Sequence, residues 1–482
     1  MPYRSSPVRR ANAGAALVLA SVLHLAACAA HAPGEGPDEL RGKSSPSGTS
    51  PSVFGAQPAH LPNVIAQARA MNLSWMRYHL RWDLIEATPG TYAWKAANDS
   101  DIAAMAEQNL PAVYIFGTPV WARQPGREGK LCGPIDASQE AAFRAFVRAA
   151  VNRYKPWVRY WELWNEPDAA YDLLGATSPY GCWGELTQEN YGGEYYARFL
   201  KAFSEEVKAA DPTAKVLSGG ILLGCDNDPG GACANGNAGT NPRFIQGVLE
   251  EEVRQGARFF DILAFHSYAY FNSLGKDFQR TAAAWGPFGV LHGKTDYLRR
   301  LMGQYQSSRP LLMNEGGLIV SDSCQLSEPI VQNAANEAWR LYLRTWALGL
   351  LGSVWYTLDA PGWRCSGLLN EVNGVSPATA VSFLANTLAG ATYVGSVGSG
   401  VVEGYRFCKG ELEYRAYFTN DAALGVQPLP TPPDAVALYD KLGAPLVLGE
   451  SIPASFEPLL LERRPAGGCK DYRVYLPVIR KN

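Results

Sequence analysis

The sequence predicts an α/β fold in which a (β/α)8 TIM barrel is followed by a smaller C-terminal β-sandwich domain. Short apolar segments alternate with amphipathic helical segments over roughly 320 residues, the pattern expected of parallel strands joined by helices. From about Val381 onward helical periodicity fades and alternating apolar and polar residues replace it, as in antiparallel sheets. A doubly wound sheet is the alternative, but neither a GxGxxG nor a P-loop motif follows any expected strand.

Each expected element has a local signal. The eight barrel strands are short apolar runs, at Val53–Gln57, Trp75–Leu80, Ala112–Phe116, Val158–Asn165, Lys215–Gly219, Phe260–His266, Leu311–Asn314 and Ser353–Thr357. Helical spacing of apolar residues marks the segments between them, at Asn63–Met71, Ala97–Gln108, Gln139–Tyr154, Tyr195–Ala210, Pro242–Gln255, Lys294–Gln304 and Gln332–Leu348. The sandwich strands are the alternating runs Val401–Cys408, Leu412–Phe418, Val436–Tyr439 and Phe456–Leu461.

The N-terminus reads as a targeting segment. Three arginines precede an apolar run that is short for a membrane span and that ends Leu25-Ala26-Ala27-Cys28. This ending resembles a bacterial lipobox, which implies that Cys28 is lipidated; ordinary cleavage after Ala30 or Ala32 is the alternative. The expected organisation is therefore a lipoprotein-type signal segment at 1–28, a flexible linker at 29–50, the barrel at 51–380 and the β-sandwich domain at 381–482.

The net charge and the cysteines of the chain limit its possible partners and its cellular location. A net charge of −2 with 18% charged residues argues against nucleic acid as a partner, and it leaves the lipid anchor as the only expected membrane contact. The signal segment predicts an exported protein, either a cell-surface or periplasmic lipoprotein or a secreted one. Without Cys28, eight of the nine cysteines remain, and pairing of neighbouring loops predicts disulfides Cys132–Cys182, Cys225–Cys233, Cys324–Cys365 and Cys408–Cys469. Their spacing does not suggest a zinc site.

Two carboxylates end strands on opposite sides of the expected barrel. Glu166 stands in the run Trp161-Glu162-Leu163-Trp164-Asn165-Glu166-Pro167-Asp168 at the end of strand four, and Glu315 ends strand seven. Catalytic groups of (β/α)8 barrels collect at the C-terminal ends of the strands. Paired carboxylates with an amide and aromatic rings nearby suit the cleavage of glycosidic bonds, because sugars offer hydroxyls for hydrogen bonds and flat C–H faces for stacking.

The Asn-Glu-Pro motif and the later lone glutamate resemble the clan A retaining glycoside hydrolases, most closely the family 39 and family 5 types. Three more landmarks follow the clan's order: Trp82–Glu86 with Gly90–Trp94, Thr118–Ala122, and Ala264–Tyr268. The resemblance covers about residues 52–375, and more loosely the β-sandwich. Glu86-Ala87 departs from the clan's frequent Glu-Pro, a loop detail that bears on no catalytic role.

The resemblance implies a role for each site residue. Glu166 would be the general acid/base, Glu315 the nucleophile, and Asn165 the partner of the sugar 2-hydroxyl. Substrate-binding positions around them would be Arg77, His266, Tyr268, Trp355 as the sugar platform, and Trp121 in an outer subsite. Structural alternatives stay open: a buried salt bridge to Glu162 for Arg77, a buried structural imidazole for His266, and core packing for both tryptophans.

The expected activity is hydrolysis of O-glycosidic, β-configured bonds of oligo- or polysaccharides by double displacement, with no metal or cofactor. Carbohydrate is the expected partner. The alternatives are a carbohydrate-binding pseudoenzyme and a transglycosylase on the same scaffold. Sugar and linkage specificity are set by loop side chains, and the sequence does not indicate them.

Overall fold

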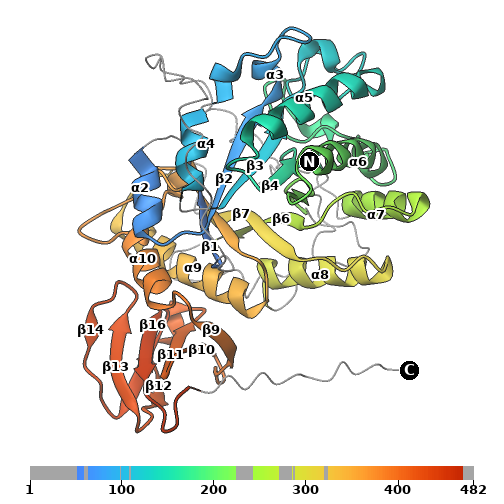
Figure 1. Ribbon diagram of the computed structural model, residues 1–482. Coiled ribbons are helices and arrows are strands. Elements are labelled where there is room, and N and C mark those ends of the chain that lie inside the picture. Colours follow the sequence, from blue (N-terminus) through green and yellow to red (C-terminus); the bar gives the residue numbers. More distant parts are fainter. Residues whose placement is uncertain are drawn as a thin grey trace, which may run out of the picture.

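The computed structural model describes residues 52–58, 63–97, 99–107, 110–223, 243–270, 285, 288–319 and 324–469 (Figure 1). Four features expected from the sequence lie outside these residues: the signal segment, the linker, Cys28 and the Cys225–Cys233 pair. Among the described residues, no helix is both long and apolar enough to span a bilayer.

Eight parallel strands form the larger domain. They are β1 (Phe54–Gln57), β2 (Trp75–Arg81), β3 (Leu110–Phe116), β4 (Tyr160–Leu163), β5 (Lys215–Leu217), β6 (Leu263–Tyr270), β7 (Leu311–Ile319) and β8 (Ser353–Tyr356). They pair in the order β5-β4-β3-β2-β1-β8-β7-β6, so consecutive strands are paired except β5 and β6, and β1 pairs with β8. This is the order of a (β/α)8 barrel and confirms the predicted fold.

Isolated bridges join the two ends of this sheet. Leu217 and Ile221, in and after β5, bridge in parallel to Ile262 and Phe265 of the β6 segment. The backbone N–H of His266 donates to the carbonyl of Ile221 at 2.8 Å. The ring of strands is therefore closed, with its thinnest seam between β5 and β6.

Helices cover the outside of the strands (Figure 1). They are α2 (Asn63–Ala70), α3 (Trp82–Ile85), α4 (Asp99–Ala106), α5 (Glu140–Tyr154), α6 (Gly193–Ala210), α7 (Arg243–Gln255), α8 (Val290–Gln304), α9 (Glu328–Ala347) and α10 (Pro377–Thr387). In α6, for example, Tyr196, Phe199 and Phe203 recur at helical spacing and are buried. The core lies between this apolar helix layer and the sheet.

An antiparallel β-domain follows the barrel. Its strands are β9 (Thr392–Ser396), β10 (Val402–Lys409), β11 (Leu412–Thr419), β12 (Gln427–Pro430), β13 (Ala435–Asp440), β14 (Pro445–Leu446), β15 (Ser451–Ala454) and β16 (Leu459–Arg463). Six form a sheet in the order β14-β13-β16-β11-β10-β9, and β12 pairs with β15 in a second sheet. Both sheets contribute to one apolar cluster, of Val402, Tyr417, Leu438, Ile452, Ala454, Leu459 and Leu461. The expected boundary at 380/381 falls within α10, and it stays a prediction.

Three of the four expected disulfides are confirmed. Cys132–Cys182 joins the loops after β3 and β4, and Cys324–Cys365 joins those after β7 and β8. Cys408–Cys469 lies in the β-domain. The first two link neighbouring loops on the side of the barrel where the strands end.

Buried charge connects the two domains. Arg344 of α9 has a fully buried side chain and donates to Glu403 of β10 at 2.8 and 3.2 Å. The Tyr405 hydroxyl donates to the same carboxylate at 2.7 Å. One turn earlier, Arg340 donates to the carbonyls of Thr419 and Phe456. The junction is thus held by hydrogen bonds that are shielded from water.

We expect Arg344→Met to lower the free energy of unfolding by about 3–5 kcal/mol, because it removes the cation that pairs with the buried Glu403 carboxylate. Adding Glu403→Leu should recover most of this loss, since a buried ion pair and an apolar pair are of similar stability. Urea unfolding checks both. The control is Arg198→Met, whose ion pair with Glu140 is 47% and 23% exposed and should contribute less than about 1 kcal/mol. Equal losses in Arg344→Met and Arg198→Met would contradict the expectation.

Candidate active site

The backbone turns sharply as it leaves β4 and presents Glu166. Trp164 and Glu166 both have positive φ, 73° and 45°, a conformation uncommon for residues other than glycine. Hydrogen bonds hold this turn: the N–H of Trp164 donates to Ile115 O at 2.8 Å, and that of Glu166 to Gly220 O at 2.9 Å. Strain that is held in place by its surroundings is typical of functional sites.

Glu315 lies within β7, four residues before the strand ends, whereas the sequence predicted it at the end. In the β6–β7 ladder Phe265 pairs with Met313 and His266 with Glu315, so Asn314 is an extra residue. Such a bulge changes the direction of the following side chain. The Glu315 carboxylate accepts from Arg77 Nη1 at 2.8 Å and from the Tyr268 hydroxyl at 2.6 Å.

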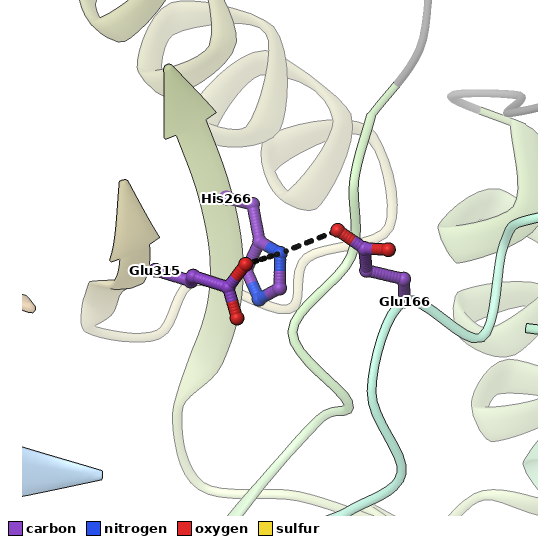
Figure 2. Close-up of side chains that lie close together, drawn as sticks. All are labelled: Glu166, His266 and Glu315. Carbon is purple, nitrogen blue, oxygen red and sulfur yellow. Dashed lines mark hydrogen bonds and ion pairs between the residues drawn. The ribbon is translucent and has the colours of Figure 1, made fainter. Parts of the chain in front are cut away.

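The two carboxylates meet at His266. Its Nδ1 lies 3.0 Å from Glu166 Oε1 and 3.7 Å from Glu315 Oε1 (Figure 2). One oxygen of each carboxylate and one nitrogen of His266 all lie within 4.8 Å of one another. The side chains of Glu166 and Glu315 are each 11% exposed, while His266 is fully buried. A small part of each carboxylate therefore remains open to a substrate.

One oxygen each of Glu166 and Glu315 and one nitrogen of His266 lie close enough together to bind a metal ion. The positive Arg77 guanidinium, already bound to Glu315, opposes a second cation at this position. The hydrogen bond between His266 and Glu166 uses the atoms a metal would need. The arrangement fits acid/base chemistry by a carboxyl group better than it fits metal binding.

Arg77 connects most of the polar groups of the site. Its guanidinium binds both oxygens of Glu162, at 2.9 and 3.1 Å, and the Asn165 Oδ1 at 2.7 Å, in addition to Glu315. Glu162 in turn accepts from Asn314 Nδ2 at 2.9 Å and from Gly220 N at 2.7 Å. The buried salt bridge to Glu162, the structural alternative for Arg77, is therefore present together with an ion pair to Glu315, and a substrate-binding role for Arg77 stays a prediction.

Burial sets the charge states. It raises the pKa of Glu166 to about 7, against the lowering effect of Arg77 and Lys294. It lowers the pKa of His266 to about 4, so the imidazole is neutral at neutral pH. Burial disfavours the charge of Arg77, but Glu162, Tyr114 and Glu315 together raise its pKa above the usual value. The site thus combines a permanent cation with a carboxyl that holds its proton near neutrality.

The aromatic residues near the carboxylates differ from the expectation that Trp355 forms the sugar platform. Trp355 is completely buried and donates its Nε1–H to Ser366 O at 2.6 Å, so its ring has no open face. The next residue, Tyr356, interacts electrostatically with Glu315 and Glu166, and burial raises its pKa. Trp363, in a short helix at Trp363–Cys365, contacts both Tyr268 and Tyr356, with centroids 5.7 and 6.2 Å apart.

Sequence reasoning missed Tyr356 and Trp363. Neighbouring residues on a strand point to opposite faces, so Trp355 and Tyr356 cannot both face the carboxylates; this signal was available for Tyr356. Trp363 had a weaker one, its place two residues before the paired Cys365. Trp121 is partly buried, donates to Glu86 O at 3.0 Å and packs edge-on against Trp82. Its role in an outer subsite stays a prediction.

Comparison with solved structures tests the fold independently. The chain is similar to a family 39 glycoside hydrolase from the gut symbiont Bacteroides cellulosilyticus WH2, with 20% identity, a TM-score of 0.64, and coverage of 86% of this chain and 81% of that one. It is also similar to a family 30 endoxylanase from Clostridium papyrosolvens C71, with 11% identity, a TM-score of 0.54, and coverage of 88% and 98%. A monomeric β-xylosidase from Caulobacter crescentus CB15 matches with 16% identity, a TM-score of 0.51, and coverage of 87% and 98%. No protein-family model and no curated protein sequence matches the chain. The chain therefore has the fold of the clan A glycoside hydrolases, a (β/α)8 barrel with an attached β-sheet domain.

Proposed function

We propose that the protein is a retaining glycoside hydrolase that cleaves β-configured O-glycosidic bonds by double displacement. The observation that carries this proposal is the distance between the two carboxylates, of which one oxygen each lies within 4.8 Å of the other. Retaining enzymes hold their carboxyl groups about 5–5.5 Å apart, whereas inverting enzymes need about 6.5–9.5 Å to admit a water molecule. The short separation favours direct attack by one carboxylate.

The environments of the carboxylates divide their roles. Glu166, with a pKa raised to about 7, can hold a proton and donate it to the leaving oxygen. Glu315, held by Arg77 and the Tyr268 hydroxyl, is the nucleophile that forms the glycosyl ester. Once the ester forms, the negative charge of Glu315 is lost and the pKa of Glu166 falls. Glu166 then takes a proton from the water that hydrolyses the ester.

The other site residues position the sugar. The Oδ1 of Asn165 accepts from Arg77 at 2.7 Å, which leaves its amide N–H groups to bind the 2-hydroxyl, a contact that strengthens in the transition state. The Nδ1 of neutral His266 is hydrogen-bonded to the Glu166 carboxyl group. Tyr356 and Trp363 supply an aromatic surface beside Tyr268 and are better placed than buried Trp355 to contact a sugar face.

The substrate is a carbohydrate of undetermined sugar type. The similar structures include a xylanase and a β-xylosidase, and pentose-containing glycosides are accordingly the first to test. We propose further that the protein is exported and lipid-anchored through Cys28. The disulfides are compatible with export, because they persist in oxidising compartments.

The stereochemical outcome tests the proposal. The purified protein is screened against aryl β-glycosides, and the best substrate is followed by proton NMR. We expect the β-anomer of the free sugar to appear first, with the α-anomer arising later by mutarotation, because two displacements restore the configuration. First appearance of the α-anomer would exclude a retaining mechanism. Glycosyl transfer to added sugar without release of free sugar would instead identify a transglycosylase.

A further inference from the structure

A lysine is buried behind Glu166, and the reaction described above does not use it. Lys294 lies in the second turn of α8 and is 6% exposed. Its ammonium donates to two backbone carbonyls, Leu222 O at 2.7 Å and His266 O at 2.9 Å. The Trp285 ring centroid lies 5.8 Å from its Nζ. Among the described residues no carboxylate contacts this ammonium directly, and a buried lysine without an acidic partner in contact is unusual.

A buried acid is the counterpart of this lysine. Asp168, two residues after Glu166, is 1% exposed, and its carboxylate accepts from the backbone N–H groups of Leu222 and Leu223, both at 2.8 Å. Leu222 is therefore held at its N–H by Asp168 and at its carbonyl by Lys294. The segment after β5, which contains Leu222, also contacts Glu166 directly, because Gly220 O accepts a hydrogen bond from the N–H of Glu166.

These contacts join three parts of the site. Asp168 ties the loop after β4 to the segment after β5, and Lys294 ties that segment to β6 at His266. His266 is the residue whose ring is hydrogen-bonded to Glu166. The connections cross the β5–β6 seam, where isolated bridges replace a continuous ladder. Lys294 and Asp168 therefore connect the two sides of the β5–β6 seam next to Glu166.

Charge acts on Glu166 from several elements. Arg77 of β2 and Lys294 of α8 favour its ionised form. Burial raises the pKa of Asp168 to about 7, against its backbone hydrogen bonds, and the negative charge of Glu166 adds to this rise. Asp168 therefore opposes the ionisation of Glu166 mainly on the alkaline side of neutrality. Neutral His266 and Tyr268 from β6, Glu315 from β7 and Tyr356 from β8 are the other titratable groups that interact with Glu166 or lie beside it among the described residues. Burial lowers the pKa of Lys294 to about 8, against the effect of Asp168 and Glu166, so the ammonium is charged at neutral pH.

We propose that Lys294 and Asp168 are positioning residues that hold Glu166 and His266 in place across the β5–β6 seam and, through their opposite charges, set the pH range of activity. This inference rests on the proposed function, because Glu166 is taken to be the acid/base. A purely structural role for the pair would predict instability in the variants but no opposed movement of the pH profile.

The test compares Lys294→Met and Asp168→Asn with Lys294→Arg in the full-length protein, on the aryl β-glycoside that the wild type hydrolyses best. Removing the positive charge disfavours ionised Glu166, so the alkaline limb of kcat/KM against pH should move to higher pH in Lys294→Met. Removing the negative charge should move it to lower pH in Asp168→Asn. We also expect Lys294→Met to lower kcat by about tenfold or more through misplacement of the acid/base. Lys294→Arg should return the limb toward the wild-type position.

The matched control is Lys208→Met. Lys208 of α6 also joins neighbouring strands through a carbonyl and a carboxylate, Ala214 O and Asp261 Oδ2, both at 2.6 Å, but at the opposite ends of β5 and β6. Its pH profile should match the wild type. The proposal would be overturned if the alkaline limb moved in the same direction in Lys294→Met and Asp168→Asn. It would also be overturned if the limb moved in neither of these variants although both were folded.

A second measurement separates this inference from the proposed function. Carbon-13 NMR of glutamate-labelled protein, with Glu166→Gln to assign the signal, follows the titration of Glu166 without substrate. If no glycoside is cleaved but the Glu166 titration moves in opposite directions in the two variants, the effect of Lys294 and Asp168 on Glu166 stands, while the proposed function fails and with it the pH range of activity. If the enzyme is active and the titration does not move, the inference fails alone.

Discussion

Glu315→Ala is expected to lower kcat on an activated aryl β-glycoside by about 10⁵-fold or more, since the residue proposed to form the covalent intermediate is removed. Its neighbours should stay in place, because Arg77 keeps its two contacts with Glu162 and the one with Asn165. The space left by the carboxylate is open to a small anion, and the positive Arg77 favours one. Added azide should therefore restore part of the rate and give the α-glycosyl azide.

Steady-state kinetics and NMR of the azide product check this expectation. The control is Glu205→Ala, whose side chain is 48% exposed on α6 and pairs with Arg144; it should keep wild-type activity. Undiminished turnover in Glu315→Ala would remove Glu315 from the mechanism. Rescue with formation of the β-glycosyl azide would point to the other carboxylate as the nucleophile.

The second large effect concerns Glu166→Ala, which should depend on the leaving group. A glycoside with a poor leaving group needs a proton in the first step and should lose about 10²–10⁴-fold in kcat/KM. A dinitrophenyl glycoside does not need that proton and should lose much less. Azide attacks the ester without a general base, so it should speed turnover of the dinitrophenyl substrate and give the β-glycosyl azide.

The pH profile gives the same variant an independent readout. In the wild type, Glu166 must be protonated for the first step, and its pKa lies at about 7. Wild-type kcat/KM should therefore fall as pH rises through about 7, and this alkaline limb should be missing in Glu166→Ala. An alkaline limb that persists unchanged in the variant would assign the ionisation to another group.

The strand pattern of the barrel was predictable because each strand is a short apolar run between helices that carry their own periodicity. The strand ends were less so. Val158–Asn165 was expected as one strand, but regular pairing covers only Tyr160–Leu163, because Trp164 turns into the left-handed region. The bulge at Asn314 depends on how β7 pairs with β6, a relation between two strands that neither sequence segment contains.

The two residues proposed to react stand in sequence motifs, whereas the residues that support them do not. Glu166 and Glu315 stand in recognisable local sequences, and Arg77 follows from its strand position. Lys294 stood at the start of an expected helix, but α8 begins at Val290, and that places Lys294 under the β5–β6 seam. Its partners Leu222 and His266 are distant in sequence, so only the closed ring brings them together. Trp355 and Tyr356 are adjacent on β8. Motif matching favours Trp355 as the residue that contacts the sugar, whereas the observed strand directs Tyr356 toward the carboxylates.

The order of strands has a consequence for how activity arises in the chain. The first four strands and the turn after β4 carry Arg77, Glu162 and Glu166, and the last four strands carry His266, Tyr268 and Glu315. Each half of the barrel therefore contributes one of the two carboxylates proposed to react, and Arg77 connects the halves by binding Glu162 and Glu315. A nascent chain released after its fourth strand would contain Glu166, the proposed proton donor, but not Glu315, the proposed nucleophile. The contacts of Arg77 with Glu162 and with Glu315 can therefore form together only after the seventh strand has been synthesised.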